Sequence, residues 1–540
     1  MNDLQKWIRI RKELYRQMET QVRHRLGEDT PELERYQKTY EAEFNKKWQA
    51  STKDALIEQI AVSRVVLMGD FHAMKQSQKA QLRILRTLPP QRPKVLAVEF
   101  FESADQAKVD RFMSGKMSEK DFLKAIQWQG KWGFPWEHYR PLIRWAQKSK
   151  VPVYGINKST KKRNASTLKS RDVFAGKLIA ELANKQPDSL VFVIYGDLHL
   201  AQSHIPAEIT KNLGAPFAKS ILRIFQNAEK IYFQLLGKEL ESSTDLVRIS
   251  KNSFCLMSVP PWVKWQNYLM YLEQAYDLDL DDDDDDDELD YTDHVSRYVK
   301  IISEELNLPV AMAGLSVYTA KDTQLWGHLK EKYDARQLKW IESLISDEMS
   351  FYLPEVGVAY LARGTVNHAA SLAMQFVHAQ ICQNPRSFSE MPADFLPRIW
   401  IEAVSYFGSK IINYKRKADT ITDLKASLAS KSPVDHGKEA MMLALSQKMH
   451  EMMVITGSPK HRRLTQPRMK WSYMTAAALL GGMMGERIYF GYRKKLLSLK
   501  TLQDFLKKPV ANANFQVAYY DMVEVVESLP TPFNSKKEKL

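Results

Sequence analysis

The sequence predicts an α/β protein with a mostly parallel sheet and flanking helices, followed by a mainly α-helical C-terminal region. Three observations support this prediction. Short apolar runs alternate with longer amphipathic segments in the first half of the chain, which is typical of βαβ units. The runs are apolar throughout, as expected for strands covered on both faces. Seven consecutive aspartates, residues 281–287, separate this half from one in which most segments have helical spacing.

At 540 residues the chain is too long for one ordinary core, and we expect four parts. They are a helical N-terminal extension (1–52), an α/β domain (53–276), an acidic linker (277–290) and a mainly helical domain (291–540). In the extension, Trp7, Ile10, Leu14 and Met18 recur at helical spacing. The aspartate run repels itself and cannot form a core, which indicates a linker. A calcium site is the alternative, although the run lacks the glycine and spaced ligands of an EF-hand loop.

The secondary-structure elements follow in order along the chain. The predicted strands are 64–68, 94–98, 151–156 and 190–195, and the helices between them are 77–88, 119–128, 139–148 and 171–184. Residues 222–259 alternate more, for example at 230–235, and are expected to add edge or hairpin strands. The clearest helices after the linker are 323–333, 366–382, 397–415 and 436–454.

The longest apolar stretch near the C-terminus is residues 473–485, which is about 13 residues against roughly 20 needed to span a bilayer. We expect a buried helix in which Gly481, Gly482 and Gly485 allow close packing, and no integral membrane span.

The N-terminal 25 residues are densely charged and have no apolar core of a signal peptide. Cys255 and Cys382 are the only cysteines, which excludes a disulfide framework and favours a reducing compartment. A cytoplasmic location is therefore expected.

The formal net charge is +14, but basic and acidic residues are interleaved. The densest basic stretch, 158–171, is interpreted as a solvated loop, with an anion or nucleic-acid contact as the alternative. No zinc finger, RNA-binding signature or Gly-rich phosphate loop is present, so a nucleic-acid partner is not expected.

A tetrapeptide pattern occurs twice, each time directly after an apolar strand. Residues 69–72 read Gly-Asp-Phe-His and residues 196–199 read Gly-Asp-Leu-His. Glu99 follows a third strand, 94–98. Open α/β sheets place their ligands at the carboxyl ends of the strands. A carboxylate in such a position is expensive to bury unless it is paired, hydrogen-bonded or bound to a metal. We therefore expect these residues to share one pocket.

Two imidazoles and one carboxylate are the components of a divalent metal site with open positions for water or substrate. His72, Glu99 and His199 are the predicted metal ligands and catalytic residues, because a bound metal would generate a nucleophile from water. Without a metal, the same Glu and His could act as general base and acid. Asp70 and Asp197 are either ligands or N-caps of the following helices, and we favour an N-cap for at least one.

Other candidate residues have both structural and functional interpretations. The aromatic segment 132–139 is either a packed loop in which Pro135 opens a helix, or the mouth of a pocket with Glu137, His138 or Tyr139 facing a ligand. At the start of helix 171–184, Asp172 favours a helix N-terminus, whereas Arg171 could reach an anionic substrate. His368 and His378 do not share a helix face and are interpreted as structural or surface residues.

The order of these motifs resembles the ChaN-like proteins of the Tiki/TraB/erythromycin-esterase superfamily over residues 55–215. The motifs are Gly69-Asp70-Phe71-His72, Val98-Glu99-Phe100-Phe101, the stretch Trp132–Leu142, the stretch Pro152–Asn157, Arg171-Asp172 and Gly196-Asp197-Leu198-His199. The resemblance implies an α/β domain with one site made of two Gly-x-x-His motifs and a strand-end Glu. Its functional set becomes His72, Glu99 and His199.

The resemblance implies more than one activity. Tiki members are regarded as metal-dependent proteases, erythromycin esterases as hydrolases using His and Glu, and ChaN members are linked to haem binding and iron uptake. The leading hypothesis is a metal-dependent hydrolase, a peptidase or esterase of the Tiki/ChaN type with a divalent metal ion as cofactor. Its small-molecule or peptide substrate and any homo-oligomer are left open by the sequence.

Two alternatives remain. One is a haem- or porphyrin-binding protein with an apolar pocket, for which Phe100, Phe101, Trp132, Phe134 and Trp136 are candidates. Within it, the predicted cofactor-binding residues are Trp136, His138, Tyr139 and Arg171. The other is a non-catalytic scaffold.

Overall fold

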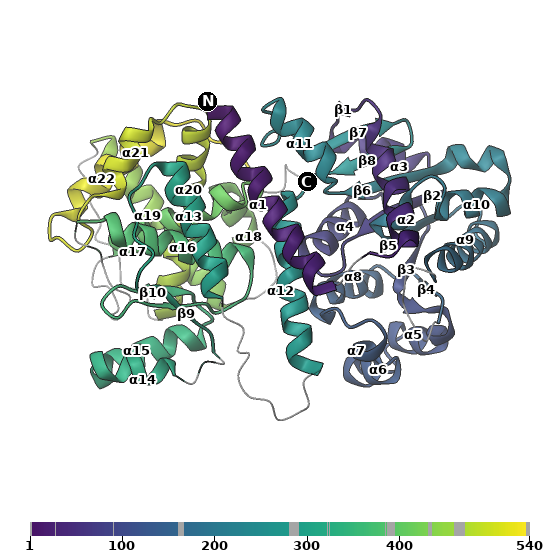
Figure 1. Ribbon diagram of the computed structural model, residues 1–540, viewed down its shortest axis with the longest axis horizontal. Coiled ribbons are helices and arrows are strands. Elements are labelled where there is room, and N and C mark those ends of the chain that lie inside the picture. The colour runs from purple at the N-terminus through teal and green to yellow at the C-terminus, as the bar shows by residue number, and fades with distance from the viewer. Residues whose placement is uncertain are drawn as a thin grey trace. The chain divides into compact units, whose positions relative to one another are not determined.

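The computed structural model describes residues 3–26, 29–89, 91–159, 167–279, 291–320, 322, 324–383, 385, 395–429, 435–457 and 470–535. Its chain divides into two compact units, residues 1–272 and 273–539 (Figure 1). Most of the expected acidic linker and the centre of the basic stretch 158–171 lie outside the described residues.

The first unit contains an eight-stranded sheet in the order β1-β7-β8-β6-β2-β5-β3-β4. Its strands are β1 (Gln49–Ala50), β2 (Val65–Asp70), β3 (Lys94–Glu102), β4 (Val153–Asn157), β5 (Leu190–Gly196), β6 (Ile221–Gln226), β7 (Leu246–Ser250) and β8 (Ser253–Leu256). Only β7 pairs antiparallel, with β1 and β8; the other neighbours are parallel. This confirms the predicted mostly parallel sheet. Each of the four predicted strands is present, and β2 and β5 are buried along their whole length.

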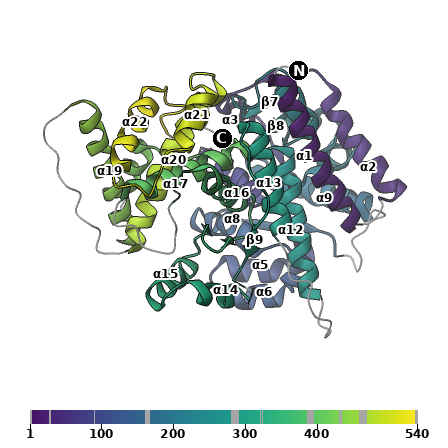
Figure 2. The same cartoon turned by 60° about the vertical axis from the view of Figure 1, so that its left-hand side comes forward.

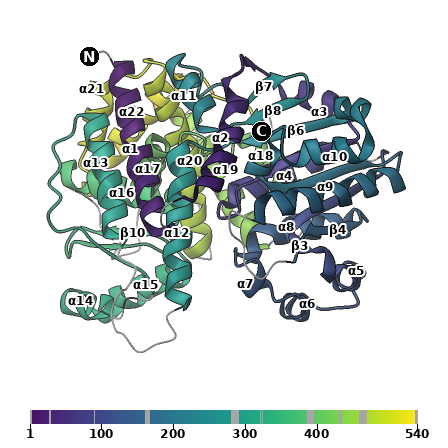
Figure 3. The same cartoon turned by 45° about the vertical axis from the view of Figure 1, so that its right-hand side comes forward.

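Helices cover both faces of this sheet. They are α3 (Lys53–Ala61), α4 (Lys75–Thr87), α5 (Gln106–Met113), α6 (Glu119–Ala125), α7 (Trp128–Lys131), α8 (Trp136–Lys148), α9 (Leu168–Lys185), α10 (Ile205–Leu213), α11 (Glu229–Gly237) and α12 (Pro261–Asp279). The chain crosses the sheet from β2 to β4 and returns through β5 to β6. Because parallel crossovers are right-handed, α4 and α8 pack together on one face and α9 and α10 on the other (Figure 3).

One expected strand of the first unit is a helix. Residues 230–235 belong to α11 rather than to an edge strand. Its buried side chains are Ile231, Tyr232, Leu235 and Leu236, a spacing that places all four on one helix face. The alternation seen in the sequence is too short to distinguish the two structures, and packing on the sheet decides in favour of the helix.

The N-terminal residues form two helices, α1 (Asp3–Leu26) and α2 (Pro31–Ala42), followed by the short 3-10 helix η1 (Glu43–Asn45). In α1, the predicted apolar positions Ile10, Leu14 and Met18 are buried. Val22 of α1 packs with Leu269 and Leu272 of α12. The two helices lie beside each other in Figure 2. These helices belong to the same compact unit as the sheet.

The second unit is mainly helical, as predicted. Its helices are α13 (Thr292–Leu306), α14 (Leu325–Lys332), α15 (Ala335–Ser346), α16 (Val366–Ile381), α17 (Phe395–Ile412), α18 (Ile421–Leu428), α19 (Asp435–Ile455), α20 (Lys470–Arg493), α21 (Leu499–Leu506) and α22 (Phe515–Ser528). A small sheet in the order β10 (Phe351–Leu353), β11 (Val358–Tyr360) and β9 (Ser316–Tyr318) was not predicted, because strands of three residues leave no periodic pattern.

No helix in the described residues is long and apolar enough to cross a membrane.

Helix α20 packs closely on α17 through glycines, as expected. A Cβ atom at Gly485 would lie 2.5 Å from the carbonyl oxygen of Ala403 and 3.0 Å from the backbone nitrogen of Phe407. At Gly482 the nearest atom would be the Cβ of Ala418 at 3.6 Å, an ordinary contact. Gly481 is equally close, since a Cβ atom there would lie 2.7 Å from the backbone nitrogen of Ala403. The close approach of the two helices therefore depends on Gly481 and Gly485 and not on Gly482.

We expect Gly485→Ala to destabilise the second unit by about 1–3 kcal/mol, because the helix backbones must separate. The control is Gly482→Ala, which should be neutral or stabilising by up to about 1 kcal/mol, since alanine favours the helix. Hydrogen exchange of peptides from α17 and α20, followed by mass spectrometry, measures both effects. Equal protection in the two variants would contradict this account of the packing.

Candidate functional site

The three predicted ligands converge at the carboxyl ends of the central strands. A Cβ atom at Gly196, the last residue of β5, would lie 3.5 Å from His72 Nε2, 3.4 Å from Glu99 Oε2 and 3.3 Å from His199 Cδ2. His72 follows β2, Glu99 lies within β3, and His199 lies in the 3-10 helix η4 (Asp197–Leu200). Because glycine has no side chain, Gly196 leaves the space in which these three groups meet.

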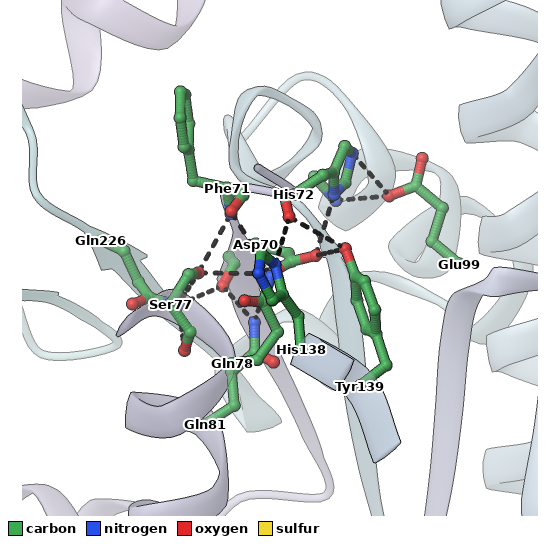
Figure 4. A network of polar contacts seen from close by, with 12 residues as sticks. Asp70, Phe71, His72, Ser77, Gln78, Gln81, Glu99, His138, Tyr139 and Gln226 are labelled. Atoms are coloured by element: carbon green, nitrogen blue, oxygen red, sulfur yellow. Dashed lines mark hydrogen bonds and ion pairs between the residues drawn. The ribbon is translucent and has the colours of Figure 1, made fainter. Parts of the chain in front are cut away.

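The Nδ1 of His72 is hydrogen-bonded to Asp70, and its Nε2 is directed at Glu99 (Figure 4). Its Nδ1 is 2.8 Å from Asp70 Oδ2, and its Nε2 is 3.8 Å from Glu99 Oε2, beyond hydrogen-bond distance. Because a carboxylate only accepts, Nδ1 carries the proton in the neutral ring and Nε2 keeps its lone pair. Burial lowers the pKa of His72, but the hydrogen bond to Asp70 and the charge of Glu99 outweigh it, so the pKa is raised above 6.5.

Asp70 is the centre of a buried hydrogen-bond network. Its Oδ1 accepts hydrogen bonds from Ser77 Oγ (3.2 Å), Gln78 Nε2 (2.6 Å) and Gln81 Nε2 (2.9 Å), all from α4. The Tyr139 hydroxyl donates to Oδ2 at 3.2 Å. Asp70 is therefore an orienting group for His72.

The expected N-cap role of Asp70 or Asp197 is wrong. Met74 precedes α4 and Gly196 precedes η4. Asp197 is buried; its Oδ2 accepts from the Tyr40 hydroxyl and its Oδ1 from the Gln226 backbone nitrogen at 3.0 Å. Both aspartates are directed into the protein, because side-chain donors from distant elements reach them there. Burial raises the pKa of Asp197 to about 7.

Arg171 reaches Glu99 and not open solvent. Its Nη2 donates to Glu99 Oε1, and the Gly196 backbone nitrogen donates to Glu99 Oε2 at 2.7 Å. Both side chains are nearly buried, at 9% and 3% exposure. Burial raises the pKa of Glu99, but the charges of Arg171, His72 and His199 and the hydrogen bond from Gly196 outweigh it and lower that pKa. Arg171, for which a contact with an anionic substrate was the alternative, thus pairs with an internal carboxylate.

His199 is held by residues that sequence reasoning missed. Its Nδ1 is 2.5 Å from Asp172 Oδ1 and 2.8 Å from the Tyr36 hydroxyl, which also donates to Asp172 Oδ2 at 2.8 Å. The ring of Tyr36 stacks on His204 with centroids 3.7 Å apart. Asp172 was interpreted as favouring a helix N-terminus, and Tyr36 carried no signal, because it lies 163 residues from His199. Both imidazoles are therefore oriented by a carboxylate at Nδ1.

A cavity of about 720 Å³ lies over these groups. His72, Glu99, Arg171 and His199 line it, together with the aromatic residues Phe71, Trp132, Phe134, Trp265 and Tyr268 and with many residues of α1 and α2. The ring centres of Trp132 and Phe134 lie 4.6 Å and 5.0 Å, respectively, from the ring centre of His72. The side chain of His72 is 24% exposed. The volume of the cavity and its aromatic lining are typical of sites for small organic ligands.

Several predicted pocket residues do not line this cavity. Trp136 is buried in the core, with its ring 5.0 Å from Trp128. Tyr139 is fully buried and supports Asp70, and His138 Nδ1 lies 3.5 Å from the carbonyl oxygen of His72. Phe100 and Phe101 are also in the core. Of the four predicted cofactor contacts, only Arg171 reaches the cavity.

The donor set does not fit a divalent metal ion. Both oxygens of Glu99 are engaged by Arg171 and Gly196. Within the described residues there is no group of three or more His, Cys, Asp or Glu side chains arranged to hold a metal. The predicted metal site at His72, Glu99 and His199 therefore gains no support, although the three residues share one pocket.

Comparison with known proteins confirms the family resemblance for part of the first unit. Residues 56–171 match the sequence model of the family described as haem-binding uptake, Tiki superfamily, ChaN. This segment contains His72, Glu99, Trp132, Phe134 and Arg171. Beyond it lie Asp172, His199 and the helices α1 and α2.

A solved structure of ChaN from Campylobacter jejuni, described as showing cofacial heme binding, matches with 14% identity and a TM-score of 0.26. The match covers 33% of this chain and 88% of that chain. No curated protein matches this chain.

Proposed function

We propose that the cavity of the first unit binds haem or a closely related tetrapyrrole, with His72 Nε2 as the iron ligand. The observation that carries this proposal is the different surroundings of the two ring nitrogens of His72. Its Nδ1 is held by Asp70, while its Nε2 lies beyond hydrogen-bond distance of Glu99, and His72 lines the cavity. A neutral imidazole held in this way through its other nitrogen is the usual form of a metal-binding histidine. Histidine is a common proximal ligand of haem iron.

The walls of the cavity support the same ligand. Trp132 and Phe134 pack beside His72, and Trp265 and Tyr268 line the cavity as well. Such aromatic surfaces suit a flat apolar ring. The matched family segment supplies His72 and the first two of these aromatic residues. The tetrapyrrole, which was the alternative hypothesis from the sequence, therefore replaces the metal-dependent hydrolase as the leading one.

Haem titration tests this function. We expect the full-length protein to bind haem with a shifted Soret band, and His72→Ala to bind it more than roughly tenfold more weakly with an altered spectrum. The control is His138→Ala, which removes a neighbouring imidazole that does not line the cavity and should leave the spectrum unchanged. Equal affinity and spectra for wild type and His72→Ala would exclude His72 as the ligand.

A second candidate function is hydrolysis of an ester or amide without a metal ion. It is favoured by the two imidazoles, each held through Nδ1 by a carboxylate, Asp70 for His72 and Asp172 for His199. An Nε2 with a free lone pair can act as a general base, and Glu99 adds negative charge between them.

The hydrolysis of nitrophenyl esters tests this second candidate. If it holds, His199→Ala and His72→Ala should each lose roughly 100-fold or more of the turnover. Haem binding through His72 predicts instead that His199→Ala leaves the haem affinity intact. Turnover at the buffer rate in the wild type would rule out ester hydrolysis.

A further inference from the structure

We propose that Arg171 is a specificity-determining residue that keeps divalent metal ions out of this site. It supplies the positive charge that a metal ion would otherwise bring to Glu99. Removing that charge should convert His72, Glu99 and His199 into a metal site. This inference concerns selection against a free metal ion and does not depend on haem binding.

Three candidate donor groups lie around Gly196. His72 Nε2 and His199 Cδ2 flank Glu99 Oε2, all within 3.5 Å of the missing Cβ position. Each imidazole has its Nδ1 beside a carboxylate, at 2.8 Å for His72 and 2.5 Å for His199. Two imidazoles backed by carboxylates and a third carboxylate between them have the composition of a divalent metal site with its supporting shell. The side chains that a metal site needs are therefore present, but within the described residues they are not arranged to hold a metal ion.

Arg171 is held against Glu99 by several contacts. Its guanidinium donates to Glu99 Oε1, the oxygen that the Gly196 backbone nitrogen does not engage. The side chain is 9% exposed, its Nε donates to Asn157 Oδ1 at 3.4 Å, and its guanidinium lies 5.9 Å from the ring centre of Tyr195. The arginine is thus anchored within the protein. A cation that bound Glu99 Oε1 would have to displace it.

The charge balance explains why this position matters. Interaction with Glu99 helps raise the pKa of Arg171, so the guanidinium stays charged despite its burial. A divalent ion at Glu99 would then lie close to a fixed positive charge in a region of low dielectric, where repulsion between cations is strong. A buried Glu99 without any partner would also be unfavourable. Arginine therefore satisfies the carboxylate and repels metal ions at the same time.

Cobalt(II) binding tests the proposal. We expect Arg171→Ala to bind about one equivalent of Co²⁺, with d–d absorption bands typical of nitrogen and oxygen ligands, at least roughly 100-fold more tightly than wild type. The matched control is Arg171→Lys, which keeps the positive charge and should bind no more than wild type. Arg171→Ala/His199→Ala should lose the gained binding. Elemental analysis after gel filtration gives the stoichiometry.

Arg171→Gln serves as a second variant, because its amide can still donate to Glu99 and preserve the fold. The inference is overturned if wild type binds Co²⁺ as tightly as Arg171→Ala. It is equally overturned if the folded Ala and Gln variants both fail to bind. If neither variant folds alone, excess Co²⁺ must restore folding, since the metal would replace the missing charge, and failure to do so also overturns the inference.

Discussion

Gly69→Ala is expected to destabilise the first unit by about 3–5 kcal/mol, because a methyl group there has no space. A Cβ atom at Gly69 would lie 1.6 Å from Asp197 Oδ1. Asp197 cannot turn away freely, since its carboxylate accepts hydrogen bonds from Tyr40 and from the Gln226 backbone. The substitution therefore breaks buried hydrogen bonds or moves β2. Hydrogen exchange of peptides from β2 and β5 measures the loss directly.

The duplicated motif provides the control for this prediction. Gly196 occupies the same motif position as Gly69, but a Cβ atom there meets its nearest neighbour at 3.3 Å. Gly196→Ala should therefore cost much less stability while placing a methyl group among His72, Glu99 and His199. The double variant Gly69→Ala/Asp197→Ala should be more stable than the sum of the single effects predicts, because the clashing atom is gone. Simple additivity would show that the clash is not the cause.

Asp70→Asn is expected to weaken the proposed haem binding roughly 10–100-fold while leaving the protein folded. Three donors, from Ser77, Gln78 and Gln81, converge on Oδ1. They will hold the amide oxygen of the asparagine and leave its NH2 group facing His72. Because this group donates, His72 must accept at Nδ1 and carry its proton on Nε2. A protonated Nε2 cannot bind iron. Haem titration with circular dichroism as the folding check measures this effect.

Asp172→Asn is the matched control, because it makes the same change beside His199. If His72 alone binds the iron, Asp172→Asn should keep the wild-type affinity for haem. Wild-type affinity in Asp70→Asn would show that Asp70 does not set the tautomer of an iron ligand. A loss in both variants would instead place both imidazoles in contact with the tetrapyrrole.

Most of the α/β architecture could be predicted from the sequence, and so could the meeting of three distant residues. Each of the runs 64–68, 94–98, 151–156 and 190–195 became a strand, because an unbroken apolar run has few other favourable structures in a sheet covered on both faces. His72, Glu99 and His199 then met because parallel strands bring their carboxyl ends to one edge. Local residue patterns were sufficient for these predictions.

The tertiary structure alone decided what surrounds those residues. Tyr36 and Asp172 hold His199 across 163 and 27 residues of chain, and Arg171 pairs with Glu99 across 72. Partners at such separations have no periodic signal in a single sequence, since they are chosen by packing of whole elements. The same reason explains why Trp136 and Tyr139 turned out to be core residues: a sequence shows that a segment is aromatic, whereas only the packed helix shows which face meets the cavity and which the interior.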